Sequence, residues 1–322
     1  MTHVGSNHIM VSTNILWSKS MKMTPIEERQ HPPARRSKLT SLDGALAHVR
    51  AGQVVALGGL WFHNNPCAAV RALARRNVRD LRIVAAPPAS YAVDLLIGAG
   101  CVAQATVGHV SFEHLGFAPN FRRAAQEGTV RIIDADEATI LGGLMATVEH
   151  LDSHPVTSVK GTDIGRSAAA PRNVSGVVAP VALRPDVCLL HAQEADIYGN
   201  VRNLGTPFCD PLFAKASKYV IVTVDRIVDN CDIRAEPNRT TIPGYLIDAV
   251  VQAPFGAHPC SSHGIHVHDE LGIGAYIKAG TNADTWRRDY FGPYVDEPES
   301  LEDYVRLVGG ADWILALSEV VR

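Results

Sequence analysis

The chain has 322 residues, of which 46% are hydrophobic and 20% are charged, and its formal net charge is −3. This composition is typical of a soluble globular protein that is long enough for one large α/β domain or two smaller ones. The mixed charges give no basic surface for nucleic acid and no apolar stretch is long enough to cross a bilayer, so we expect neither as a partner.

The first 38 residues are polar and show neither helical nor strand periodicity. We interpret residues 1–38 as a disordered leader, or partly as sequence upstream of a later start at Met21 or Met23, and residues 39–322 as one domain. The N-terminus lacks the order of a secretion signal, and the six cysteines include no C-x-x-C pair. Scattered reduced thiols of this kind are typical of cytoplasmic proteins, so we expect a cytoplasmic location.

The most informative stretch covers residues 53–76. The two-sided apolar run at 54–57 predicts a buried strand, and Gly58-Gly59 frees the backbone where that strand ends. In a parallel sheet such a turn lies at the carboxyl ends of the strands, where ligands bind. It would offer unpaired backbone N–H groups to an anion or to a developing oxyanion. The alternative interpretation is an ordinary tight connection.

A helix should follow this turn, capped by Asn64 or Asn65 and beginning at Pro66. After it, short apolar runs alternate with helical patterns, and residues 152–176, rich in Ser, Gly, Thr and Pro, predict a long loop. This alternation predicts an α/β fold with an open, doubly wound, mostly parallel sheet, followed by C-terminal helices. The expected strands cover 81–86, 103–110, 130–133, 187–191, 219–224 and 248–252, and the further expected helices cover 42–49, 91–97, 138–149, 211–217, 300–307 and 311–321.

Two carboxylates are candidates for chemistry. Glu113 follows a predicted strand beside Ser111 and two histidines, which suggests substrate positioning or a carboxylate poised by partial burial. The alternative for Glu113 is a salt bridge to Arg122 or Arg123. Glu137 opens a predicted helix, where a negative side chain is favoured simply by the helix dipole.

Two other polar groups stand out. Asp196, Gly199 and Asn200 have the pattern of a turn, and we expect that turn to shape a wall of the active site. The loop that contains His258 is rich in histidine, but its spacing matches neither a helical metal-binding pair nor a zinc finger. We therefore predict no metal site.

Several of these stretches together resemble the α subunit of the family I CoA-transferases, especially the glutaconate CoA-transferase branch. The similarity spans roughly residues 39–308 and follows one order along the chain, which no single short motif could match. The stretches that carry it are Gly58-Gly59, 112–113, Gly-Phe-Ala-Pro-Asn-Phe-Arg-Arg at 116–123, 134–137, 185–191, 195–201, 220–225 and Pro-Phe-Gly-Ala-His-Pro at 254–259.

The resemblance implies the open α/β fold that this family shares with sugar-phosphate isomerases. It also implies a CoA-transferase β-subunit partner, acyl-CoA and a carboxylic acid as substrates, and no permanently bound cofactor. In that family a glutamate attacks the thioester and becomes a glutamyl-CoA thioester, and in two-subunit members this glutamate lies on the β subunit. The matched positions imply catalytic roles for Glu113 and Glu137 and substrate contacts for Gly58, Gly59, Leu60, Ser111, Phe112, Asp196, Gly199, Asn200 and His258.

Three alternative functions stay open. One branch resembles ring-opening hydrolases of steroid or aromatic catabolism, which act on CoA thioesters through an α-subunit carboxylate, and Glu137 falls near that position. Residues 60–65, Leu-Trp-Phe-His-Asn-Asn, also depart from a common family pattern in which an aromatic and basic residues are frequent, so the acyl group is an open question. The chain could instead be a non-catalytic sugar-phosphate-binding protein of related fold, or a structural subunit that completes its partner's pocket.

Overall fold

The structure is a computed structural model, and it describes residues 35–166, 173–174 and 177–320. Most of the leader predicted over residues 1–38 lies outside the described residues. At its end, Lys38 donates from Nζ to the carbonyls of Gly244 and Ile247, at 2.7 and 2.5 Å. No helix in the described ranges combines the length and the apolar character needed to span a membrane.

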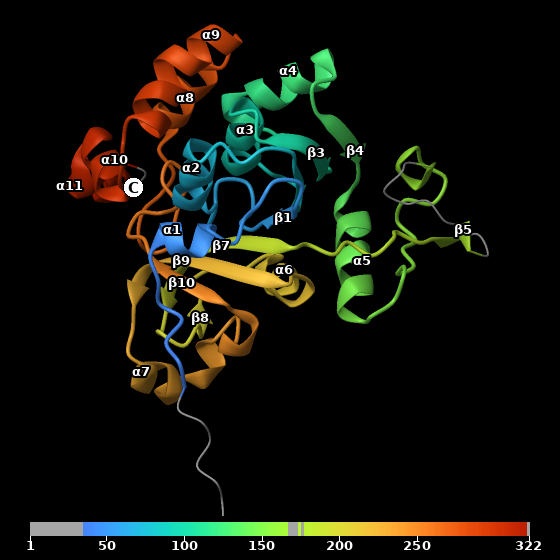
Figure 1. Ribbon diagram of the computed structural model, residues 1–322, viewed down its shortest axis with the longest axis horizontal. Coiled ribbons are helices and arrows are strands. Elements are labelled where there is room, and N and C mark those ends of the chain that lie inside the picture. Colours follow the sequence, from blue (N-terminus) through green and yellow to red (C-terminus); the bar gives the residue numbers. More distant parts are fainter. Residues whose placement is uncertain (1–34, 167–172, 175–176, 321–322) are drawn as a thin grey trace, which may run out of the picture. The chain divides into compact units, whose positions relative to one another are not determined.

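Eight strands form one sheet, in the order β10-β9-β7-β1-β2-β3-β4, with β8 beside β7 (Figure 1). Neighbours along this path are parallel, and β8 is antiparallel to β7. The predicted open and mostly parallel α/β sheet is therefore confirmed. The strands are β1 (Val54–Leu57), β2 (Leu81–Ala85), β3 (Val102–Val107), β4 (Arg131–Asp134), β7 (Val187–Ala195), β8 (Val201–Arg202), β9 (Tyr219–Ile227) and β10 (Ala249–Gln252), and a separate hairpin contains β5 (Asn173–Val174) and β6 (Val177–Val178).

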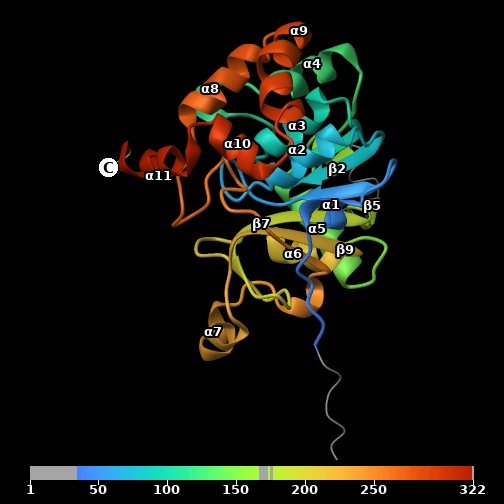
Figure 2. The same cartoon turned by 60° about the vertical axis from the view of Figure 1, so that its left-hand side comes forward.

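Helices cover both faces of the sheet, with α2 and α3 on one side and α5 and α6 on the other (Figure 2). In β1, Val55 and Leu57 pack in the hydrophobic cluster of the first face, and Ala56 packs in the cluster of the second. This explains why the run at 54–57 is apolar throughout. The helices are α1 (Leu42–Leu46), α2 (Cys67–Arg75), α3 (Tyr91–Gly98), α4 (Pro119–Glu127), α5 (Glu137–Val148), α6 (Asp210–Ala216), α7 (Asn230–Ala235), α8 (Glu270–Ala279), α9 (Ala283–Trp286), α10 (Leu301–Leu307) and α11 (Gly310–Val320).

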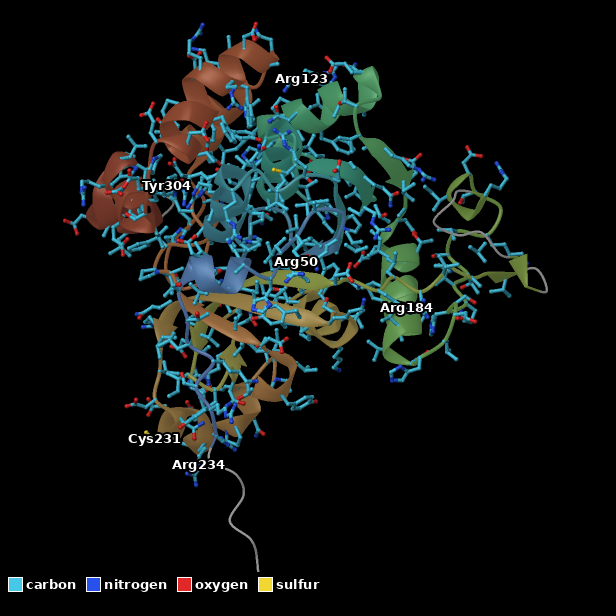
Figure 3. The ribbon with its side chains drawn as sticks, viewed as in Figure 1. Arg50, Arg123, Arg184, Cys231, Arg234 and Tyr304 are labelled. Carbon is cyan, nitrogen blue, oxygen red and sulfur yellow. The ribbon has the colours of Figure 1, made fainter. Side chains whose placement is uncertain are left out.

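The predicted C-terminal helices are present as α10 and α11. Tyr304 of α10 lies toward α2 (Figure 3), and the guanidinium carbon of Arg71 stands 3.5 Å from the centre of its ring. A π-helix over Arg287–Asp296 precedes α10 and was not expected from the sequence. The contact between Arg71 and Tyr304 holds α10 against α2.

The order of the strands reverses between β1 and β7. From β1 the chain adds β2, β3 and β4 on one side, and it then returns to place β7, β9 and β10 on the other. In open α/β sheets this switch point, at the carboxyl ends of the strands, is where ligands bind. Gly58 follows β1 directly at this edge, so the fold positions the predicted bend where a site is expected.

Two local predictions are wrong. Neither Asn64 nor Asn65 caps α2, because the helix begins at Cys67 without a side-chain cap. The amide of Asn65 instead donates to the carbonyl of Trp61 at 2.8 Å. The strand expected over 187–191 ends later, because β7 continues to Ala195.

Candidate active site at the carboxyl edge of the sheet

The bend after β1 contains three residues that we expected to contact substrate. Gly59 has a φ of +80°, a left-handed conformation that favours glycine. The amides of Gly58 and Leu60 donate to the carbonyls of Leu189 and His63, both at 2.9 Å. The Gly59 amide donates to the carboxylate of Asp210. The prediction of unpaired amides for an anion or an oxyanion is therefore wrong, because all three donors are used internally.

The acceptor of the Gly59 amide is Asp210, the first residue of α6. Its Oδ1 lies 2.8 Å from that nitrogen, and Asp210 is only 1% exposed. A Cβ added to Gly58 would lie 2.6 Å from the same oxygen and 2.5 Å from Cδ2 of Leu190, so the bend requires glycine at this position. Burial raises the pKa of Asp210 to about 7, although the Gly59 N–H opposes this effect. The bend is thus closed around a buried carboxyl group, which also removes the basis for a phosphate cradle.

Glu137 is the first residue of α5, and it is exposed. A capping box positions it, because Asp136 Oδ1 accepts the Thr139 N–H and Thr139 Oγ1 accepts the Asp136 N–H, both at 2.9 Å. Burial, and then the nearby carboxylates of Glu137 and Asp210, raise the pKa of Cys209 to about 11. The structure therefore brings the exposed Glu137 and the buried Asp210 together around one thiol.

Glu113 lies after β3 on the same edge, with a φ of +48° and 40% of its side chain exposed. Its Oε1 is 3.7 Å from Nε2 of His109, and Ser111 Oγ is 2.7 Å from the same nitrogen. Ser111 Oγ also accepts the Glu113 N–H at 3.2 Å. The alternative salt bridge is not found in the described residues, because Arg122 lies over a phenylalanine ring and Arg123 donates to a backbone carbonyl. Glu113 and Ser111 thus form a small polar group beside the histidine.

Two other residues that the resemblance assigned to substrate are buried. The ring of Phe112 is fully buried and packs 5.5 Å from that of Tyr276. His258 is 1% exposed, with Nδ1 at 2.8 Å from the Tyr304 hydroxyl and Nε2 at 3.3 Å from Asp269 Oδ2. Burial lowers the pKa of His258, against the opposing effect of Asp269. Both side chains are occupied within the core of this chain.

The turn at 196–200 forms as expected but lies away from the bend. Asp196 is fully buried, and its Oδ2 accepts the side-chain amides of Asn200 and Asn230 at 2.8 and 2.6 Å. Gly199 supplies the positive φ of the turn, at +87°. The bend is hydrogen-bonded to β7 at Leu189, and Asp196 comes several residues later in the chain. Because a strand rises about 3.3 Å per residue, the turn lies on the order of 20 Å further along β7 than the bend. The structure does not bring Asp196, Gly199 and Asn200 to the other candidates.

Sequence reasoning missed a buried polar network beneath the edge. Nε2 of His191 is 3.2 Å from Asp225 Oδ2, to which Ser262 Oγ donates at 2.5 Å. Gln193 donates from Nε2 to Asn64 Oδ1 at 2.7 Å. Burial alone would raise the pKa of Asp225, but His191 and Ser262 hold it below its usual value. The sequence feature that could have indicated this network is the presence of polar residues within the apolar runs of β7 and β9.

We predicted that the histidine-rich loop around His258 does not bind a metal ion. Within the described part of the chain, one group of three possible ligands lies close enough together, and it contains Asp229, Cys231 and Asp232. All three are exposed, and Figure 3 shows Cys231 on α7, far from Arg123 of α4. Exposed acidic groups of this kind are common without a metal, so we assign no metal role to them.

The chain matches known proteins over most of its length. Residues 39–253 match the family model described as Coenzyme A transferase. The chain is 31% identical to the A subunit of glutaconate CoA-transferase of Acidaminococcus fermentans, covering 75% of this chain and 83% of that one. It is 30% identical to the cholesterol ring-cleaving hydrolase IpdA subunit of Rhodococcus jostii, covering 79% of this chain and 91% of that one.

Another relative is longer than this chain. An uncharacterized protein of Archaeoglobus fulgidus is 31% identical over 85% of this chain, which spans only 63% of its length. Among solved structures, glutaconate coenzyme A-transferase from Acidaminococcus fermentans superposes with a TM-score of 0.79 at 28% identity, over 85% of this chain and 93% of that one. The family model matches more than half of the sequence, and the A subunit of glutaconate CoA-transferase is 31% identical to the chain. The chain therefore belongs to the coenzyme A transferase family, as a protein of the α-subunit type.

Proposed function

We propose that this chain is the α subunit of a heteromeric, cytoplasmic CoA-transferase that moves CoA between an acyl-CoA and a carboxylic acid. The observation that carries the proposal is the likeness to the A subunit of glutaconate CoA-transferase, which extends over most of both chains. CoA would be a substrate rather than a resident cofactor, and the partner would be a β subunit. The exposed Glu137 and Glu113 at the carboxyl edge give the chain carboxylates that could face that partner.

The proposed reaction assigns the nucleophile to the partner. A β-subunit glutamate oxygen would attack the thioester carbon, the C–S bond would break, and the CoA thiolate would leave with the electron pair. The thiolate would then attack the glutamyl carbon of the resulting anhydride, which releases the carboxylate and leaves a glutamyl-CoA thioester. In this scheme Glu137 and Glu113 act on substrate position and charge. The buried Asp210 sets the shape of the bend behind them.

A second function is favoured by the position of Glu137 and by one relative. Glu137 is exposed at the edge, its helix start is fixed by a capping box, and the chain is 30% identical to the IpdA subunit of a ring-cleaving hydrolase. In that case Glu137 would act directly as a base within the α subunit, and the products would be a cleaved ring or free CoA. The two functions therefore differ in whether Glu137 or a partner glutamate carries the chemistry.

The deciding experiment uses the chain assembled with its β subunit. We would assay CoA transfer to an acceptor acid against release of free CoA or cleavage of a carbon ring, for the wild type and for Glu137→Gln. A transferase retains most of its activity in Glu137→Gln and shows a glutamate on the partner that becomes sensitive to hydroxylamine when acyl-CoA is added.

The opposite result would establish the hydrolase. Loss of a general base lowers kcat by about 10²- to 10⁴-fold, so Glu137→Gln would then lose activity by this factor and no partner glutamate would react. Glu127→Gln is the matched control, because Glu127 is an exposed glutamate at the other end of a helix, α4. An assembled complex that neither binds nor turns over any CoA thioester would refute both functions.

A further inference from the structure

Two large aromatic residues close to the bend have left-handed backbones. Trp61 has a φ of +52° and Phe208 a φ of +48°. For bulky residues this conformation is an outlier that the surroundings must hold, and such outliers cluster at functional sites. His63 lies between the two rings, 6.0 Å from Trp61 and 6.1 Å from Phe208, with the Phe208 ring nearly parallel to the imidazole. All three side chains are partly exposed.

Specific contacts hold the two loops in this arrangement. The Trp61 N–H donates to the carbonyl of Pro88 at 2.7 Å, and the Trp61 carbonyl accepts the side-chain amide of Asn65 at 2.8 Å. Phe208 lies two residues before Asp210, whose carboxylate accepts the Gly59 amide. The loop after β1 and the loop before α6 are therefore fixed to one another through the same bend. The aromatic surface is pre-formed in this chain.

The tautomer of His63 follows from its hydrogen bonds. Nδ1 of His63 is 2.7 Å from Ser261 Oγ, and Ser261 Oγ is 2.9 Å from the carbonyl of Phe62. Two acceptor oxygens at this distance repel unless the hydroxyl proton lies between them, so Ser261 donates to Phe62 and accepts from Nδ1–H. A neutral His63 then carries a lone pair on Nε2, which has no hydrogen-bond partner among the described residues. Nε2 is therefore an acceptor that is available to a ligand.

Cations are missing from the loops around this surface. Six connecting segments at the carboxyl edge contain no lysine or arginine, and they are residues 58–65, 86–90, 108–114, 135–137, 203–210 and 261–268. Burial, and then the nearby His268 and His263, lower the pKa of His63, which favours the neutral imidazole. A remote carboxylate on an acyl group would find no permanent positive charge here. The described surface fits a neutral group better than an anion.

We propose that Trp61, His63 and Phe208 form the acyl-recognition surface, which takes a thioester whose acyl group contains an apolar ring and a hydroxyl that donates to Nε2 of His63. The ring would lie against the aromatic side chains, and the hydroxyl would donate to Nε2 of His63, which has no hydrogen-bond partner among the described residues. This inference rests on the proposed CoA-thioester function and adds the class of acyl group. It assigns selection of the substrate to residues of the α subunit.

The test is equilibrium binding to the assembled α and β subunits by calorimetry. The probes are non-cleavable analogues of cyclohexanecarbonyl-CoA, of its 3-hydroxy and 4-hydroxy forms, and of glutaryl-CoA, with CoA itself as a reference. We expect one hydroxylated ring analogue to bind about tenfold more tightly than the unsubstituted ring, as one added hydrogen bond gives. The glutaryl analogue should bind more weakly than the ring analogues.

Variants assign these preferences to residues. His63→Leu should abolish the preference for the hydroxyl while the affinity for the unsubstituted ring stays within about twofold. Phe208→Ala should weaken all ring analogues by about tenfold and leave CoA unchanged. His48→Leu is the matched control, because His48 is an exposed histidine stacked on Tyr219, at the opposite, amino-terminal edge of the sheet.

The outcomes separate this inference from the proposed function. If CoA binds but the wild type shows no hydroxyl preference, prefers the glutaryl analogue, or keeps its preference in His63→Leu, the inference is overturned and the proposed function stands. If neither CoA nor any analogue binds, both fail. Should His63→Leu not fold, the wild-type preferences together with Phe208→Ala decide the matter.

Discussion

Asp210 is a carboxyl group in a place where a negative charge is unfavourable. It is 1% exposed, and its Oδ1 accepts a hydrogen bond from the Gly59 amide. Burial raises its pKa to about 7, so the group is about half protonated near neutral pH. The same carboxyl fixes the direction of the Gly59 N–H, away from any ligand. This one residue therefore determines both the shape and the electrostatics of the bend.

The raised pKa of Asp210 gives stability a defined dependence on pH. The folded value is about 7 and the ordinary value is 3.8, so between these values the folded state keeps a proton that the unfolded state releases. The free energy of unfolding should therefore fall as the pH rises from about 4 to about 7, and this contribution is constant above pH 7. Asp210→Asn keeps an oxygen acceptor for Gly59 and removes the titration.

We expect Asp210→Asn to be more stable than the wild type at pH 8, by on the order of a few kcal/mol, and similar to it at pH 4. Urea unfolding at the two pH values measures the difference. Asp312→Asn, at an exposed position in α11, should show no comparable dependence. An equal difference at both pH values would contradict the raised pKa of Asp210.

The sequence predicted the position of Glu137 but not the burial of Asp210. The Asp-Ala-Asp-Glu pattern predicted the start of α5, and the structure places Glu137 there. Asp210 gave no such signal, because an aspartate before a proline at a helix start is ordinary capping chemistry. Its burial depends on packing against the bend, whose Gly59 lies 151 positions earlier in the chain. The left-handed backbones of Trp61 and Phe208 also have no sequence signature, since both arise from contacts between distant loops.

At the scale of elements, the strand–turn–helix unit of β1 and α2 depends on glycine at position 58. Its backbone passes so close to α6 and β7 that a Cβ would meet both a carboxylate oxygen and Leu190 Cδ2 at 2.6 Å or less. Gly58→Ala must move Asp210 or the strand, and overpacking of this kind costs about 1–3 kcal/mol. We expect the urea midpoint to fall accordingly.

Gly274 provides the matched comparison for Gly58→Ala. It lies inside α8, where an added Cβ meets nothing within 4 Å. Gly274→Ala should be neutral or should stabilise the protein by up to about 1 kcal/mol, because alanine is the better helix former. If the two substitutions had equal effects on the urea midpoint, close packing at Gly58 would not be what determines the bend.

Strands with apolar runs were predictable, and their polar extensions were not. The run at 54–57 became β1 with the expected ends, because both of its faces are covered by helices. β7 and β9 run further than expected, since Gln193 and Asp225 are buried in a hydrogen-bonded network that offsets the cost of placing them in the sheet. In a sequence, polar residues that follow an apolar run indicate a turn. Here their hydrogen-bond partners lie on other elements, so the sequence pattern alone does not show that they continue the strand.

At the scale of the whole molecule, the fold and the family followed from the order of motifs along the chain, and the site did not. The parallel sheet needs only alternating strands and helices, which are local patterns. Prediction of the site requires knowledge of which loops meet at the carboxyl edge. The resemblance placed Phe112, His258 and the turn at 196–200 in contact with substrate, whereas the structure buries their side chains or places them elsewhere on β7.

Buried histidines give the whole molecule a second, opposite dependence on pH. His266 is 2% exposed, its Nδ1 contacts the carbonyl of Val267 at 3.0 Å, and its Nε2 has no partner among the described residues. Burial lowers its pKa from 6.5 to about 4, against the hydrogen bond to the Val267 carbonyl and the charge of Asp225, and the nearby His258 and His191 act in the same direction as burial. A histidine held neutral stabilises the fold fully above pH 6.5, and this contribution is lost as the pH falls toward 4.

The two effects overlap between pH 4 and 6.5 and have opposite signs. In the wild type the loss of stability from His266 on acidification is partly offset by the gain from Asp210. In Asp210→Asn the offset is removed, and urea unfolding should show stability falling steeply as the pH falls from 6.5 to 4.5. Adding His266→Gln should reduce that slope by about one proton, because the two groups are on separate elements and should act additively. Adding His48→Gln instead should leave the slope unchanged, and a slope that persists in the His266→Gln double variant would show that other groups cause the acid sensitivity.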